Sequence, residues 1–433
     1  MIYIKKISQV TALSFLAFFK ISCFQHAAKV KDTSLGGVSI GLPKPSGSYQ
    51  IGIKKYYFND PKREDPFMPG SSRELIVNVY YPAEPSITAQ KAPYLDLKDQ
   101  ALAFYNDVLS KEGYDLSPLR RVVSNIFKEP LIAKQRKTYP LVVLSPGSGI
   151  PPEFYSIFIS ELVSHGWIVA AINHTYISVI SQFPDGSIRK NDSSNQLRRN
   201  LHFNGEDAQG KVVEIVANDI SQVIEKLKEI DLSRHIDFSK MTMIGHSLGG
   251  MAVTYLCPNL QSCRAGINLD GPLLGAPSSV LRAGNLTGDL TKPFLFFAGK
   301  MIVNLPKSKD AFLERKDLLE TISKLDGIWS AEEFYTYQID RFRGRLVRAA
   351  NKMGKHSSIV VLKDANHLSF SDWALLEASL SLKAVDVSQK RFLVIINQII
   401  RNFLESSINK TRGRKNLMDG VNGVNDIEIG LKE

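Results

Sequence analysis

The segment from Gly245 to Gly250 has the clearest chemical use of any motif in this sequence. It reads GHSLGG, follows the apolar run Met241 to Ile244 directly and precedes a run that can form a helix, Met251 to Leu256. A G-x-S-x-G pattern between a strand and a helix is typical of a nucleophile elbow. We therefore predict that Ser247 is a nucleophile.

The residues around this serine fit the same tight turn. Gly245 and Gly249 flank it, because such a turn leaves no room for side chains at those positions. His246 lies inside the elbow, and its side chain is expected to point away from the nucleophile. The alternative is a glycine-lined helix start that binds a phosphate, although such loops usually carry a lysine or a longer glycine array.

A serine hydroxyl needs a base to take its proton, so a histidine must lie further along the chain. His367 comes shortly after the apolar run Ile359 to Leu362, where a loop following a strand would hold it. His356 precedes that run and would lie at the opposite edge of a sheet. Three histidines before the serine fit simple loop or helix-end positions: His165, His174 and His202. We predict His367 as the general base.

An acid must orient the imidazole of that base. Asp270 ends the apolar run Gly266 to Leu269, at the sheet edge where catalytic groups gather in open α/β sheets. The commoner acid position, one strand later, follows Phe294 to Ala298 and offers no carboxylate. We predict Asp270 as the acid. Asp364 is the rival, and a turn-capping role for Asp270 is the structural alternative.

Acyl transfer also needs two N–H donors aimed at the developing oxyanion. One is expected from Leu248, the residue after the nucleophile. The other should come from Ser148, in the glycine-containing loop that follows the apolar run Leu141 to Leu144. An ordinary Gly-Pro loop is the alternative reading of that segment.

The order of apolar and amphipathic segments predicts an α/β fold. From Tyr139 onward short apolar runs alternate with helical stretches, which indicates a mostly parallel central sheet with helices on both faces. Amphipathic spacing predicts helices over Val212 to Ile230 and Phe392 to Phe403. The predicted strands of this α/β-hydrolase arrangement are Leu141–Leu144, Trp167–Ile172, Met241–Ile244, Gly266–Leu269, Phe294–Ala298 and Ile359–Leu362.

The chain of 433 residues is interpreted as a single domain over residues 41–408. Residues 300–358 form an inserted helical segment before the last core strand, and the tail, residues 411–433, lacks an apolar stripe and is expected to be mobile. Composition, with 44% hydrophobic and 22% charged residues, excludes a fibrous or globally disordered protein. The formal net charge of +11 would favour anionic surfaces such as phospholipid headgroups or nucleic acid, and net charge alone identifies neither.

The N-terminal segment, residues 1–28, has the layout of a secretory signal: two lysines, an apolar stretch, and then Cys23. Export to the periplasm or the exterior is expected, with lipid attachment at Cys23 as a further option. Export would allow Cys257 and Cys263 to form a local disulfide, and two free thiols are the alternative.

The chain resembles the platelet-activating factor acetylhydrolase family, the lipoprotein-associated phospholipase type of α/β-hydrolase. The segments that carry the resemblance are Pro45–Gly52, Val79–Pro82, Tyr139–Gly149, Glu161–Ala171 and Ile244–Gly250. In that family the acid follows the strand after the nucleophile helix, where Asp270 falls, and the histidine loop precedes a stretch similar to His367–Asp372. The resemblance implies calcium-independent hydrolysis of a short or oxidised acyl chain from a phospholipid, through an acyl-serine and with no cofactor or metal.

Three features depart from the family pattern. Pro146 stands where a histidine is usual, Leu248 replaces the common phenylalanine, and the insertion 300–358 is longer and could be a lid. Its aromatic and arginine residues, from Trp329 to Arg348, suit a lipid–water interface or, alternatively, a surface helix. No nucleic-acid module accompanies them. A cutinase-like or polyester esterase and a catalytically inactive α/β-hydrolase used for binding or adhesion remain alternatives, and the sequence does not indicate an oligomeric state.

Overall fold

The computed structural model describes residues 40–86, 88–110, 117–191, 208–271, 292–299, 308–314, 357–363, 365–373, 375–376, 387–408, 417–419 and 427–429, with a few single positions besides. The signal segment with Cys23, most of the insertion 300–358, the rival acid Asp364 and much of the tail lie outside the described residues.

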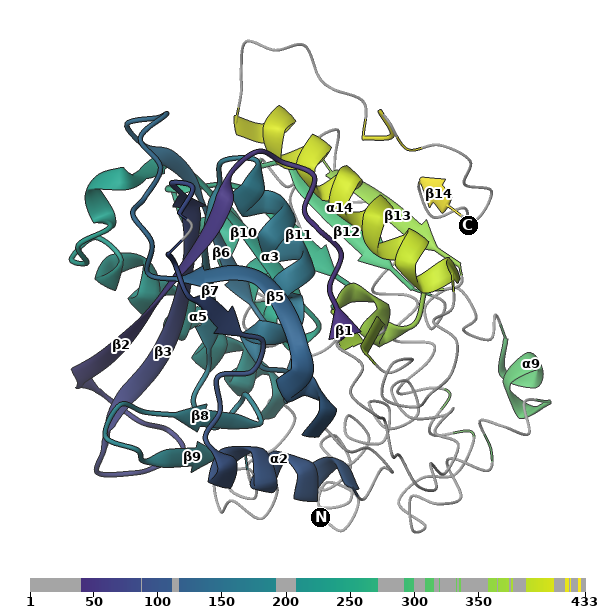
Figure 1. Ribbon diagram of the computed structural model, residues 1–433. Helices are drawn as coiled ribbons and strands as arrows, with labels where there is room; N and C mark the ends of the chain where they lie inside the picture. Colours follow the sequence, from purple (N-terminus) through teal and green to yellow (C-terminus); the bar gives the residue numbers. More distant parts are fainter. Residues whose placement is uncertain are drawn as a thin grey trace.

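A large twisted sheet forms the centre of the molecule (Figure 1). Its strands lie in the order β1-β5-β2-β3-β7-β6-β10-β11-β12-β13-β14, with β4 beside β5. Their bounds are β1 Ile40–Gly41, β2 Gln50–Glu64, β3 Ser72–Ala83, β4 Lys91–Pro93, β5 Val122–Lys128, β6 Tyr139–Ser145, β7 Ile168–Asn173, β10 Ile236–His246, β11 Cys263–Leu269, β12 Phe294–Ala298, β13 Ser357–Leu362 and β14 Ile427–Ile429. A separate hairpin joins β8 (Ile180–Gln182) and β9 (Ile188–Lys190).

The consecutive sheet strands β7, β6, β10, β11, β12 and β13 run parallel to one another, as the sequence predicted. Antiparallel pairs occur toward the two ends, where β3 pairs with β2 and β7, and β14 pairs with β13. In β6, Leu141 and Val143 pack into one apolar core, while Val142 and Leu144 pack into another on the opposite face. Strands buried on both faces need apolar residues at every position, which explains the continuous apolar runs.

Helices cover both faces of the sheet. On one face lie α3 (Ser156–Ser164) and α14 (Val387–Ile408), and on the other α5 (Ala208–Lys226) and α6 (Leu248–Leu256) (Figure 1). The remaining described helices are α2 Asp99–Ser110 and α9 Lys309–Leu313, with short 3₁₀ turns η1 Ser117–Arg121, η2 Pro152–Tyr155, η3 Ser233–His235, η4 Cys257–Asn259 and η7 His367–Phe370. Within the described part of the chain, we find no helix with the length and apolar character that crossing a membrane requires.

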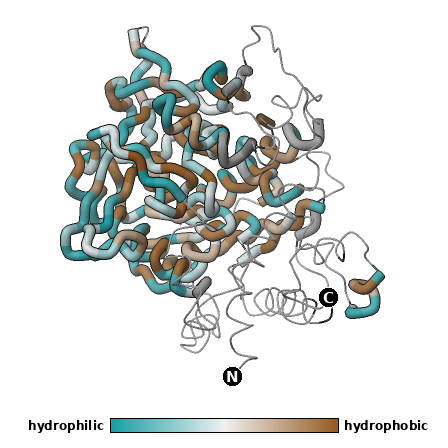
Figure 2. The backbone as a smooth tube through the Cα atoms, turned by 90° about the horizontal axis from the view of Figure 1, so that it is seen from below, coloured by the Kyte–Doolittle hydropathy of each residue, from teal (hydrophilic) through white to brown (hydrophobic). Residues whose placement is uncertain are grey.

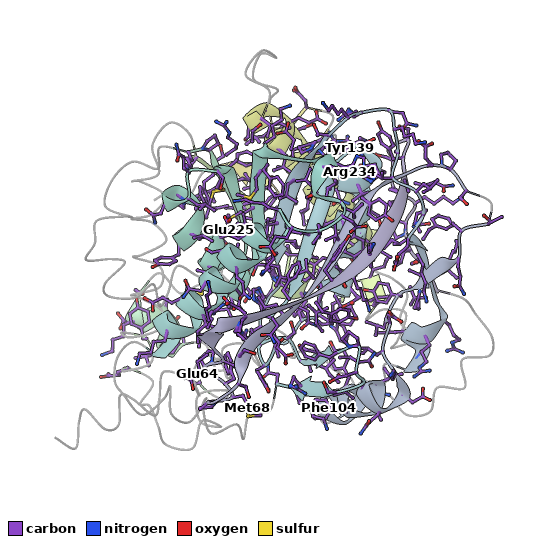
Figure 3. All side chains as sticks on the ribbon, turned by 90° about the vertical axis from the view of Figure 1, so that its left-hand side faces the viewer. Glu64, Met68, Phe104, Tyr139, Glu225 and Arg234 are labelled. Carbon is purple, nitrogen blue, oxygen red and sulfur yellow. A yellow bond between two sulfur atoms is a disulfide. The ribbon has the colours of Figure 1, made fainter. Side chains whose placement is uncertain are left out.

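The parallel strands share one carboxyl edge, and this edge positions the candidate site. Figure 3 labels Tyr139 and Arg234, which precede or begin parallel strands, at one end of the molecule and Phe104 of α2 at the other. The second end is the carboxyl edge, beside the β8–β9 hairpin that follows β7. Hydrophilic backbone segments lie mainly at the rim of the molecule, and hydrophobic segments lie further in (Figure 2).

Part of the tail is described. Ile427–Ile429 forms the strand β14, antiparallel to β13, and Leu417 and Asp419 accept hydrogen bonds through their carbonyl oxygens from Asn402 Nδ2 at 3.0 and 2.9 Å. Backbone pairing at a sheet edge needs little apolar pattern, so the sequence carried no signal for it. The structure also joins Cys257 and Cys263 in a disulfide, one of the two states that the sequence left open.

A buried cluster of charged side chains links the start of β3 to α5. Arg73 is fully buried and donates to Asp219 at 3.1 and 2.7 Å and to Asp65 at 3.0 Å. Burial acts to lower the pKa of Arg73, but these two carboxylates outweigh it and hold the pKa above the ordinary value. The guanidinium therefore compensates two carboxylates that have little access to water.

We predict that Arg73→Met lowers the free energy of unfolding by about 3–5 kcal/mol, because removing one partner leaves buried charge uncompensated. The matched control is Lys54→Met, which removes the ion pair to Asp231. In this pair the Lys54 side chain is 30% exposed and the Asp231 side chain 60% exposed. Its loss should be about 1 kcal/mol or less. Urea unfolding measures both, and equal small losses would contradict a stabilising role for the buried cluster.

Candidate active site

Ser247 occupies a sharp turn between β10 and α6. Its φ of 53° and ψ of −116° lie in a region that non-glycine residues rarely adopt. A Cβ on Gly245 would lie 2.2 Å from the carbonyl oxygen of Gly249, and a Cβ on Gly249 would lie 2.1 Å from that of Ser145. Side chains at either position would prevent the turn, which is the steric reason for the G-x-S-x-G pattern. Ser247 Oγ is buried and has no hydrogen-bond partner among the described residues.

His367 and Asp270 form a direct hydrogen bond. His367 begins η7, in the segment after β13, and its Nδ1 lies 2.7 Å from Asp270 Oδ2. Asp270 follows β11 directly, and its other oxygen, Oδ1, accepts a hydrogen bond from the backbone N–H of Gly299 at 2.9 Å. Both side chains are buried, with exposed fractions of 4% and 1%. A carboxylate bonded to Nδ1 holds the imidazole in the tautomer that carries its proton on Nδ1 and leaves Nε2 on the side away from Asp270.

The turn that carries Ser247 lies against both of these residues. The Ser247 amide donates to the carbonyl of Leu269, the residue before Asp270, at 3.0 Å. The rings of His246 and His367 lie 4.7 Å apart between centroids, and His246 Nε2 lies 3.0 Å from the carbonyl oxygen of His367. The nucleophile, base and acid that the sequence predicted therefore come from the carboxyl edge of one sheet.

His246 has contacts that the sequence did not reveal. Burial, and then the neighbouring His367, lower its pKa well below the ordinary value, so the ring is neutral. Its Nε2–H donates to the His367 carbonyl, which leaves Nδ1 to accept from the hydroxyl of Tyr155 at 2.7 Å. That hydroxyl in turn accepts the N–H of Gly147 at 3.0 Å. His246 thus links the histidine segment to the loop after β6, and only its place in the elbow could have drawn attention to it.

The loop after β6 passes beside the nucleophile. A Cβ on Gly147 would lie 3.3 Å from Ser247 Cβ. The amides of Gly147, Gly149 and Ile150 all donate to protein acceptors, whereas the Ser148 amide has no acceptor among the described residues. The Leu248 amide begins α6, where the helix itself supplies no acceptor. The two amides predicted as oxyanion donors are thus available to a ligand.

Residues 36–235 match the family model described as platelet-activating factor acetylhydrolase, isoform II. Over these residues the chain is similar to the platelet-activating factor acetylhydrolase family. The match ends at residue 235, before the turn that carries Ser247. It therefore does not include Ser247, Asp270 or His367, whose arrangement comes from the structure alone.

Three curated relatives carry the name platelet-activating factor acetylhydrolase. The protein from Canis lupus familiaris is 25% identical over 297 residues, which cover 59% of this chain and 59% of that protein. The Cavia porcellus protein is 28% identical over 156 residues (32% and 36%), and the Bos taurus protein 30% identical over 154 residues (30% and 35%). The chain therefore matches less than two thirds of the length of these relatives.

A solved structure shares the fold. The ferulic acid esterase from Streptomyces cinnamoneus superposes with a TM-score of 0.61 and 22% identity, covering 86% of this chain and 94% of that one. This similarity shows an α/β-hydrolase fold, in agreement with the parallel sheet and the two helical layers.

Asp372 is a further buried acid, in the same segment as His367. It accepts hydrogen bonds from the amides of Ser156 and Ile157, from Ser156 Oγ and from the hydroxyl of Tyr94, at 2.7–3.1 Å. It therefore caps α3 from a distant segment and holds the η7 region to that helix. Burial raises the pKa of Asp372 to about 6, and these donors limit the rise.

Elsewhere a cavity of about 330 Å³ lies beside β2, β3 and β5. Tyr80, Tyr94, Glu153 and Ser156 are among the residues that line it, and none of the predicted catalytic residues does.

No cluster of three His, Cys, Asp or Glu side chains within the described ranges is suited to hold a metal ion.

We predict a pH dependence of stability from Asp372. Its pKa rises from 3.8 to about 6 on folding, so the folded protein holds this proton more tightly and loses stability when it ionises. Between about pH 4 and about pH 7, wild type should lose about 3 kcal/mol relative to Asp372→Asn, which cannot titrate. Urea unfolding across this range measures the difference.

Asp231→Asn is the control. Burial acts to raise the pKa of Asp231, but Lys54 and Tyr56 outweigh it and lower the pKa. Its contribution is therefore lost as pH falls, at more acidic pH and with the opposite sign. A constant difference between wild type and Asp372→Asn over the whole range would contradict the assignment.

Proposed function

We propose that this protein is a serine hydrolase of carboxylic esters that acts through an acyl-serine intermediate. Ser247 Oγ attacks the ester carbonyl while His367 Nε2 accepts its proton, and Asp270 stabilises the resulting imidazolium. The carbonyl oxygen becomes an oxyanion that accepts hydrogen bonds from the amides of Ser148 and Leu248. When the tetrahedral intermediate collapses, the C–O bond to the alcohol breaks and His367 returns the proton to the departing alkoxide. A water molecule then attacks the acyl-serine by the same route and releases the acid.

The observation that carries this proposal is the His367–Asp270 hydrogen bond of 2.7 Å beside the strained turn of Ser247. A buried imidazole oriented by a carboxylate is the arrangement that activates a serine hydroxyl. The unused amide of Ser148 and the lack of a described partner for Ser247 Oγ support a site prepared for a ligand.

The proposed substrate is a phospholipid carrying a short acyl chain. The similarity of residues 36–235 to the acetylhydrolase family and the names of the relatives support this choice. The net charge of +11 suits contact with an anionic lipid surface. We further propose that residues 41–408 act as one catalytic domain, and that the protein is exported, which the Cys257–Cys263 disulfide supports.

Replacing the nucleophile tests the reaction. Ser247→Ala should lower kcat for p-nitrophenyl acetate by about 10⁴-fold or more, because the remaining groups cannot supply an attacking oxygen. Ser221→Ala in α5, which removes a hydroxyl that donates to the Ala217 carbonyl, should retain wild-type kcat. Wild-type turnover by Ser247→Ala would contradict Ser247 as the nucleophile. No turnover by the wild-type protein, together with no reaction with a fluorophosphonate, would support a non-catalytic binding protein instead.

A comparison of substrates tests the lipid preference. We expect hydrolysis of a phosphatidylcholine with an acetyl group at the second glycerol position, presented in vesicles, and a fall of about tenfold or more when that group is a long acyl chain. Soluble p-nitrophenyl esters of the same acyl lengths serve as the matched series. Vesicle hydrolysis no faster than that of Ser247→Ala, together with good turnover of the soluble esters, would favour a cutinase-like or polyester esterase.

A further inference from the structure

A second chain of hydrogen bonds between a serine, a histidine and an aspartate lies behind the candidate site. Ser145 Oγ, at the end of β6, lies 3.0 Å from His174 Nε2, and His174 Nδ1 lies 2.9 Å from Asp219 Oδ2. All three side chains are buried, with exposed fractions of 0%, 2% and 0%.

The surroundings define the direction of each hydrogen bond. Arg73 donates to both oxygens of Asp219, and Arg63 Nη1 lies 2.6 Å from Oδ1. Asp219 is therefore ionised and accepts the Nδ1–H of His174. Burial lowers the pKa of His174 despite Asp219, so the ring is neutral and its Nε2 is an acceptor. The hydroxyl of Ser145 must then donate to His174.

The backbone of His174 holds the far end of the same loop. Its carbonyl oxygen accepts the amides of Ile177 and Ser178 at 2.9 and 2.8 Å, which closes a turn after β7. The carbonyl of Ile177 in this turn accepts the amide of Gly149 at 2.9 Å. Arg73 also donates to the carbonyl of Thr175 at 3.0 Å, so the buried charge cluster fixes the turn as well.

Ser148 thus lies between two anchored positions, Ser145 before it and Gly149 after it, and both anchors lead to His174. Because the Ser148 amide itself has no acceptor among the described residues, its direction depends on these neighbours. We infer that His174, held by Asp219 and bonded to Ser145, is a positioning residue that aims the Ser148 amide at the oxyanion of the proposed ester hydrolysis.

This inference rests on the proposed function and adds residues that do not touch the substrate. From the sequence we interpreted His174 as a simple loop or helix-end residue. Its two partners lie 29 and 45 residues away in the chain, so no local pattern indicates them. Misplacing a catalytic group by about 1 Å can cost about a hundredfold in rate. A loop that loses one anchor should therefore lose transition-state stabilisation without losing its fold.

Ser145→Ala is the variant of choice, because it removes the donor to His174 and leaves the His174–Asp219 pair and the core volume nearly intact. The matched control is Ser160→Ala in α3, which removes another buried hydroxyl away from this loop. We expect kcat for p-nitrophenyl acetate to fall about tenfold to a hundredfold in Ser145→Ala, with KM within about twofold of wild type. Ser160→Ala should keep the wild-type kcat, and both variants should have similar melting temperatures.

A tetrahedral analogue separates positioning from a general structural effect. A trifluoromethyl ketone that adds to Ser247 places an oxyanion at the two amides, whereas the same compound with a methylene in place of the carbonyl does not. In Ser145→Ala the affinity for the ketone should fall by the same factor as kcat/KM, and the affinity for the methylene compound should stay unchanged. Unchanged kcat, or equal weakening of both compounds, would overturn the inference.

Reaction of the wild-type protein with a fluorophosphonate distinguishes failure of the hydrolase function from failure of the positioning role. If Ser247 does not react, the proposed hydrolase function fails, and the positioning role fails with it. If Ser247 reacts normally and Ser145→Ala retains wild-type kcat, only the positioning role is wrong.

Discussion

The strained turn at Ser247 is the constraint on which the other features of the site depend. A positive φ at a residue with a side chain is costly, so the surrounding structure must hold it in place. Here β10 is paired on both sides, by β6 and β11, and the Ser247 amide is bonded to the carbonyl of Leu269. The central position of β10 gives the turn this support. An edge strand would leave one side of it unpaired.

Hydrogen bonds between side chains and backbone then relate the segments at the carboxyl edge to this turn. Tyr155 and His246 join the loop after β6 to the carbonyl of His367, and Asp372 joins the segment after His367 to the start of α3. Each of these groups is buried, where a polar group without a partner is expensive. The segments can therefore move relative to one another only by breaking these buried hydrogen bonds. This is the physical meaning of preorganisation in this site.

The elements with a strong apolar pattern could be predicted from the sequence. Phe294–Ala298 was predicted as a strand with the bounds of β12, and the other core strands differ from the predictions by a few residues at their ends. The grouping of Ser247, Asp270 and His367 could be predicted because each follows such a strand. The links made by Tyr155, His174 and Asp372 could not, because hydrogen bonds between distant segments leave no periodic signal. The strand β14 escaped prediction for a related reason, since its pairing with β13 is made by backbone groups.

The place of the acid follows from the path of the histidine segment. His367 comes from β13 and must reach Asp270 on β11, so the chain passes the end of β12. A Cβ on Gly299, at that end, would lie 2.6 Å from the carbonyl oxygen of Ala365, so a side chain there would push the segment away. An aspartate at residue 299 would meet this obstacle, whereas glycine allows the close approach and gives its amide to Asp270 Oδ1. Because Asp270 lies next to the carbonyl that accepts the Ser247 amide, an acid after β11 links the proposed acid and the proposed nucleophile through two adjacent strand ends. A glycine at residue 299 is therefore a requirement of this packing.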